Sequence, residues 1–175
     1  MMFNKEFKVL TITVFLLNIC FAKSSFAGLE DQIIGRWTAK YTQSDASSSL
    51  TSDGVDEYLP NHTEKSSGSL IVDQSSGGEK MHGLLRFTVS GTWQVGKDGL
   101  LYETITNSQV VVGSFKVNGT EILDERREIF RQLMSETLMP GFTAKIKTIS
   151  IDSNTWVEQL EEDGQIYQVT ARRVN

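Results

Sequence analysis

The stretch LRFTVSGTWQV, residues 85–95, alternates apolar and polar side chains along its whole length. Its odd-numbered positions carry Leu, Phe, Val, Gly, Trp and Val, whereas its even-numbered positions carry Arg, Thr, Ser, Thr and Gln. Because successive side chains of a β-strand point to opposite faces of a sheet, the pattern predicts a strand with one face in a core and the other in water. The same period recurs over residues 33–41 and 165–174.

Turn signals divide the rest of the chain into short segments of weaker alternation. The predicted turns are Asp53-Gly54, Pro60-Asn61-His62, Ser75 to Gly78, Asp98-Gly99, Asn118-Gly119, Asp152-Ser153-Asn154 and Asp163-Gly164. Further strands are expected over residues 55–59, 68–74, 100–106, 109–117, 143–151 and 155–161. Hairpin-type turns between such strands predict an all-β, antiparallel up-and-down barrel of about eight to nine strands. An open sheet wrapped around a helix is the alternative.

Two segments break this pattern. Residues 42–52 are rich in Ser, Thr and Asp, which predicts a mobile loop near one open end of the barrel. Residues 124–138 have helical period, with Asp124 as the expected N-cap and Pro140-Gly141 as the stop. The apolar stripe of this amphipathic helix comprises Ile129, Phe130, Leu133, Met134 and Leu138. The helix is expected to pack on the barrel wall or plug one end.

The N-terminus resembles a secretory signal. The run from Val9 to Ala22 follows a short charged region and, at about fourteen residues, is shorter than the roughly twenty that a membrane-spanning helix needs. Ser25-Phe26-Ala27 predicts cleavage after Ala27, with Ala22 as the second choice and a retained anchor as the alternative. The expected organisation is a signal peptide over residues 1–27 and one barrel domain over 28–175, with no integral membrane segment after signal removal.

Charge and cysteine content narrow the partners and the location. The chain has a net charge of −5, and residues 1–27 carry +2 of it, so the mature part would carry −7. An acidic chain without a basic run is a poor nucleic-acid binder. The only cysteine, Cys20, lies in the expected signal, so the exported domain would have no disulfide. These features favour a bacterial protein that is periplasmic or secreted.

The chain resembles the bacterial lipocalin-like, or calycin, group of small barrels. The likeness rests on Gly35-Arg36-Trp37 in the first strand and Arg172-Arg173 in the last. In that group an Arg or Lys from the closing strand covers the tryptophan of a first-strand Gly-x-Trp. The resemblance therefore implies that Trp37 and Arg173 form a structural cation–π contact, and that the interior holds one small ligand.

Aromatic residues are the best candidates for a ligand site. Tyr41, Phe87, Trp93 and Phe115 are expected to face inward, with Tyr102 as a further candidate. These rings either fill the core or line a cavity for an apolar or amphipathic ligand.

The sequence supplies no catalytic residue, metal site or cofactor motif. His62 and His82 lie in or next to turns and have no partner at metal-ligand spacing. The acidic residues Glu158, Glu161, Glu162 and Asp163 are expected at a solvated hairpin edge. An enzyme, such as an isomerase or hydrolase, is therefore only the third hypothesis.

Two non-enzymatic functions are favoured over an enzyme. The first is an exported small-molecule-binding module with an apolar or amphipathic ligand in a barrel cavity. The alternative is a protein-interaction or inhibitor module of the bacterial envelope, with a filled barrel core and a protein partner.

Overall fold

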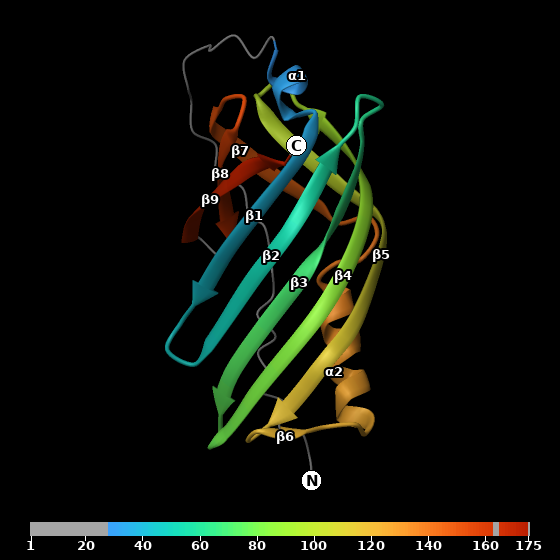
Figure 1. The fold of residues 1–175 in the computed structure, drawn as a ribbon, viewed down its shortest axis with the longest axis vertical. Helices are drawn as coiled ribbons and strands as arrows, with labels where there is room; N and C mark the ends of the chain where they lie inside the picture. Colours follow the sequence, from blue (N-terminus) through green and yellow to red (C-terminus); the bar gives the residue numbers. More distant parts are fainter. Residues whose placement is uncertain (1–27, 163–164, 175) are drawn as a thin grey trace.

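The structure, a computed structural model, describes residues 28–162 and 165–174, and its strands form a closed ring (Figure 1). The elements are α1 (Leu29–Ile33), β1 (Gly35–Ser44), β2 (Ser48–Tyr58), β3 (Thr63–Ser76), β4 (Glu79–Val95), β5 (Leu100–Val117), β6 (Thr120–Glu121), α2 (Glu125–Glu136), β7 (Thr143–Ile151), β8 (Thr155–Glu162) and β9 (Gln165–Val174). The expected signal peptide and the Asp163-Gly164 turn lie outside the described residues.

Each strand pairs antiparallel with its neighbours around the ring. Around the ring the order is β1-β2-β3-β4-β5-β7-β8-β9, the pairing of β1 with β9 closes it, and the short β6 adds to β5. This arrangement confirms the predicted all-β up-and-down barrel and excludes the open sheet. None of the helices in the described ranges is long and apolar enough to cross a membrane.

The loop predicted over residues 42–52 is wrong. β1 continues to Ser44 and β2 begins at Ser48, so only a tight turn separates the two strands. The Asp45 carboxylate holds this turn by accepting hydrogen bonds from the backbone N–H groups of Ser47 at 2.6 Å and Ser48 at 2.7 Å. Strands whose outer face meets water accept Thr and Ser. The polar composition of residues 42–52 is therefore compatible with paired strands.

The predicted turn at Asp53-Gly54 is also wrong, because Gly54 lies inside β2. It pairs with Gly68 of β3, which in turn pairs with Phe87 of β4. A Cβ atom at Gly68 would lie 2.9 Å from Phe87 Cζ. The two glycines therefore make room for an inward-pointing ring, and their function is close packing rather than chain reversal.

The strand boundaries within β5 also differ from expectation. Residues 100–106 and 109–117, predicted as separate strands, form the single strand β5. The pairing of β4 with β5 shifts register between Ser90 and Gly91. Such a bulge shifts the alternation of inward and outward side chains by one residue. The sequence pattern therefore predicted two strands where the structure has one.

Two apolar clusters occupy the two ends of the barrel. The first, beside α1, includes Leu29, Ile33, Trp37, Tyr58, Trp93, Leu101, Ile146, Trp156 and Ala171. The second, beside α2, includes Leu50, Leu70, Leu85, Val110, Val112, Phe115, Ile122 and Phe130. In Figure 1 α1 and α2 lie toward opposite ends of the long β1–β5 strands.

Helix α2 confirms the predicted amphipathic segment. The Asp124 side chain accepts a hydrogen bond from Arg126 N at 3.0 Å, as an N-cap does. Phe130 stacks on Phe115 with ring centroids 4.7 Å apart. Ile129 was expected on the buried stripe but is 41% exposed, because the buried side of the helix centres on Phe130.

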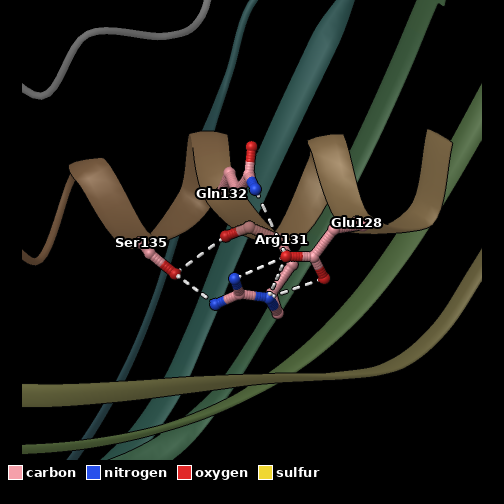
Figure 2. Close-up of polar contacts among 4 residues, drawn as sticks. All are labelled: Glu128, Arg131, Gln132 and Ser135. Carbon is pink, nitrogen blue, oxygen red and sulfur yellow. Dashed lines mark hydrogen bonds and ion pairs between the residues drawn. The ribbon is translucent and has the colours of Figure 1, made fainter. Parts of the chain in front are cut away.

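Polar contacts between residues three or four apart run along α2 (Figure 2). Arg131 forms an ion pair with Glu128 at 2.6 Å, and Ser135 Oγ donates to the Arg131 carbonyl at 2.8 Å. Gln132 Nε2 also donates to Glu128 Oε1. Pairs three or four residues apart stabilise a helix by only a few tenths of a kcal/mol, so packing at Phe130 contributes more to its position.

Arg173 joins the closing strand to the first. Its guanidinium lies 4.1 Å from the centroid of the buried Trp37 ring and donates to Ile34 O at 2.8 Å and Gln32 O at 2.6 Å. A Cβ atom at Gly35 would lie 2.3 Å from Arg173 Nη1, and Gly35 has a φ of +136°. The glycine of the Gly-x-Trp triplet is therefore needed for both its backbone conformation and its lack of a side chain.

Replacing Arg173 should destabilise the barrel. We expect Arg173→Met to lower the free energy of unfolding by about 2–4 kcal/mol, because it removes a cation–π contact and two charge-assisted hydrogen bonds. Urea denaturation checks this. The matched control is Arg172→Met, which changes an exposed neighbour on the outer face and should stay within about 0.5 kcal/mol of wild type. Equal effects of the two substitutions would contradict the assigned role.

Candidate functional site

Four carboxylates lie on the inner face of the barrel, one on each of four strands. Asp56 of β2 pairs directly with the buried Trp37, and Glu103 of β5 pairs with the buried Trp93. Glu64 of β3 pairs with the buried Tyr58, and Glu158 of β8 lies two residues from Trp156. Residues opposite one another in a sheet, or two apart in a strand, share a face. These four carboxylates therefore point inward and are called the inner carboxylates below.

The inner carboxylates occupy the middle of the barrel, between its two apolar ends. Asp56, Glu103 and Glu158 each lie two residues from a member of the α1-side cluster on the same strand. These cluster members are Tyr58, Leu101 and Trp156, and in each case the carboxylate lies on the side away from α1. The α2-side cluster begins further along the same inner face, at Leu50 on β2 and Leu70 on β3. The inner face is therefore apolar at both ends and acidic between them.

Glu64 is the most buried of the four, with 4% of its surface exposed. Its carboxylate lies over Gly91, where a Cβ atom would come within 2.4 Å of Glu64 Oε1 and 2.5 Å of Thr104 O. Residues 91–93, Gly-Thr-Trp, repeat the Gly-x-Trp pattern of residues 35–37, and here the glycine makes room for an acidic side chain. Nearby, Trp93 Nε1 donates to Leu59 O and Thr63 O at 3.2 Å each, which holds the β2–β3 turn.

Tyr58 links the aromatic cluster to the acidic one. Its hydroxyl donates a hydrogen bond to Glu103 Oε1. Its ring makes edge-to-face contacts with Trp93 at 5.9 Å and Trp156 at 5.4 Å between centroids. Edge-to-face packing orients the ring, so the phenol oxygen is directed at the carboxylates.

Burial makes every inner carboxylate a weaker acid. Desolvation, followed by repulsion from Glu103 and Asp56, raises the pKa of Glu64 to about 9 and that of Glu158 well above its ordinary value. Desolvation also raises the pKa of Glu103 to about 7, against the opposing hydrogen bond from Tyr58. The pKa of Asp56 is raised by desolvation, which a Ser66 hydrogen bond partly offsets.

The four groups have no basic partner in the described part of the chain. The ion pairs there involve other residues: Lys40–Asp53, His82–Asp73, Arg126–Asp124, Arg127–Glu121 and Arg131–Glu128. Buried carboxylates without a cation are costly when ionised. The site therefore favours either protonated side chains or a positively charged occupant.

The inner carboxylates do not form a recognisable metal site. No group of three or more His, Cys, Asp or Glu side chains in residues 28–162 and 165–174 is arranged to hold one. A metal ion needs its ligands within about 2.0–2.6 Å, whereas a larger organic cation can contact carboxylates that lie further apart.

The aromatic residues proposed from the sequence fall in different places. Tyr41 lies on the inner face, in step with Trp37 on β1, and Phe87 covers the two glycines described above. Trp93 belongs to the α1-side cluster and Phe115 to the α2-side cluster. Of these five proposed rings, Tyr41 and Phe87 thus face inward without being among the buried members of either cluster.

Tyr102 does not face inward. Its hydroxyl donates to the exposed Asp98, and Lys145 Nζ lies 5.6 Å from its ring centroid. The inner positions of this part of β5 are Leu101, Glu103 and Ile105. The prediction failed because the carboxylate at position 103 interrupts the apolar alternation of Leu101 and Ile105, which marks the true inner face.

The inner carboxylates were missed for the same reason. Glu158 was expected at a solvated hairpin edge, which is wrong, because it shares the inner face with Trp156. A usable signal was present: Glu158 stands between Trp156 and Leu160 at a spacing of two, and Glu103 stands likewise between Leu101 and Ile105. A carboxylate flanked in this way by apolar residues is a candidate for an inward position.

A comparison of the sequence with protein-family models found no match, and a comparison with curated proteins found none either. The resemblance to lipocalin-like barrels therefore stays a prediction, and the function is argued from the geometry.

Stability should fall as the pH rises. The pKa of Glu103 is raised from 4.5 to about 7, so the folded state keeps a proton that the unfolded chain releases. Its contribution is fully present below pH 4.5 and is lost as the pH rises through 7. We expect Glu103→Gln to gain stability relative to wild type between pH 5 and pH 8, on the order of 3 kcal/mol from a shift of this size.

Chemical denaturation at several pH values measures this difference. Glu57→Gln is the matched control, because Glu57 neighbours Tyr58 on the opposite face of β2. Its stability relative to wild type should not change with pH over the same interval. A flat difference for Glu103→Gln as well would contradict the buried, desolvated position of that carboxyl.

Proposed function

We propose that this chain is an exported small-molecule-binding protein whose barrel interior holds an amphipathic ligand with a cationic group. One observation carries the proposal: four carboxylates share the inner face, and none has a basic partner among the described residues. A ligand ammonium or guanidinium group would supply the missing charge, and its binding would favour ionised carboxylates.

The partial exposure of the inner carboxylates supports the presence of space for a ligand beside them. Asp56, Glu103 and Glu158 remain half-buried, although burial is the main cause of their raised pKa values. Partial exposure and a pKa raised by burial are compatible when the exposed part of these side chains faces the space inside the ring rather than bulk water. The rings of Trp37, Trp93 and Trp156 at the α1 end are at most 2% exposed, so the packing is tighter there.

The flanking apolar residues suit the rest of the ligand. Phe87 and Tyr41 lie on the inner face, so a hydrocarbon chain could be buried there at about 25 cal/mol per Å² before ordering costs. Aromatic rings also attract organic cations. The preferred ligand is therefore a cationic amphiphile rather than a fatty acid, whose carboxylate would meet like charge.

A matched pair of probes tests this. Dodecyltrimethylammonium and dodecanoate share a chain length but differ in charge, and both can be titrated below micelle formation by tryptophan fluorescence and calorimetry. We expect the cation to bind at least about tenfold more tightly, a difference of about 1.4 kcal/mol. Near pH 7 its binding should also release protons, because carboxyls that hold a proton in the free protein become ionised.

Variants separate the inner site from surface charge. The double variant Glu64→Gln/Glu103→Gln should lose the preference for the cation, whereas Glu57→Gln should keep it. Equal binding of the two probes by wild type would contradict a cationic ligand. Failure of both probes to bind would contradict a ligand-holding interior and favour the alternative of a protein-interaction module with a filled core.

A further inference from the structure

A hollow lies on the outer face of the barrel, over strands β1 to β5. Its volume is about 680 Å³, within the roughly 300–1,000 Å³ range of small-molecule sites. Arg36, Glu57 and Lys65 face it from three neighbouring strands. These residues alternate with inward side chains such as Trp37 and Glu64, so the hollow is separated from the inner carboxylates by the sheet itself.

Short side chains form the floor of this hollow. Ser67 of β3 pairs with Thr88 of β4, and Ser90 follows on the same face. Long side chains stand around them, including Arg36 and Lys65. The register shift beside Ser90, where Thr106 Oγ1 donates to Ser90 O at 3.0 Å, adds local twist to the sheet. A patch of small residues within a border of long ones leaves the surface hollowed.

Most residues that line the hollow have polar side chains, and their charge is locally positive. Arg36 and Lys65 each stand opposite Glu57 in the strand register, yet none of the three takes part in the ion pairs of the described chain. Two cations and one carboxylate leave a net positive charge on a protein whose overall charge is −5. Asn107 and Gln109 add amide donors and acceptors at the β5 side.

We propose that this hollow binds an acidic oligosaccharide. Hydroxyl and amide side chains both donate and accept hydrogen bonds, as sugar hydroxyls do, and Arg36 and Lys65 complement a uronic acid carboxylate. An apolar ligand would leave the hydroxyl groups of the floor without hydrogen-bond partners. The acidic chain as a whole disfavours a polyanion as long as a nucleic acid, whereas a short acidic sugar needs only the local charge.

The probe is trigalacturonate, with neutral maltotriose as its uncharged counterpart. In calorimetric titration of the purified protein we expect a Kd on the order of 1 mM or tighter for trigalacturonate and at least tenfold weaker binding of maltotriose. Backbone amide shifts in NMR spectra should change at Ser67, Thr88 and Gln109. The double variant Arg36→Gln/Lys65→Gln should lose at least tenfold in affinity, and Ser67→Tyr, which fills the floor, should abolish binding.

Lys40→Gln is the matched control, because Lys40 is an exposed cation of β1 that does not line the hollow. It should keep wild-type affinity, and so should Glu103→Gln, which alters only the interior. No binding of trigalacturonate, equal binding of maltotriose, equal loss in Lys40→Gln, or shifts confined to interior residues would each overturn the proposal. Because the probes and variants differ from those of the inner site, either proposal can fail alone.

Discussion

Closure of the ring between β1 and β9 is the constraint on which the other features depend. The seam pairs only Arg36 to Ala39 with Ala171 to Val174. Arg173 strengthens it by covering Trp37 and by donating to two carbonyls of the segment around the end of α1. Once the ring is closed, each strand has an inner and an outer face, and every alternate side chain must enter a shared interior.

That interior is unusual because its middle is acidic. Burial inside the ring, between apolar clusters at both ends, desolvates the Glu64 and Glu103 carboxyls and raises their pKa values. A purely structural barrel would be more stable with apolar residues of similar size at these positions. Residues that reduce stability without a structural partner are typical of functional sites, and this reasoning links the fold to the proposed ligand.

Three glycines allow side chains from neighbouring strands to approach the backbone closely. Gly35 accommodates Arg173, Gly68 accommodates Phe87, and Gly91 accommodates Glu64. In each case a Cβ atom would collide with a side chain that comes from another strand. Although the two Gly-x-Trp triplets look alike in the sequence, one makes room for a cation at the closing seam and the other for a buried carboxylate.

The sequence by itself determined the strand alternation, the capped helix after Asp124 and the class of the fold, because these depend on local periodicity and local hydrogen bonds. It also predicted the contact of Trp37 with Arg173 through a resemblance. Only the tertiary structure decided that Glu103 and Glu158 point inward and that Tyr102 points outward. A binary pattern assigns charged residues to solvent, whereas in the closed ring the strand register assigns each side chain to a face, whatever its charge.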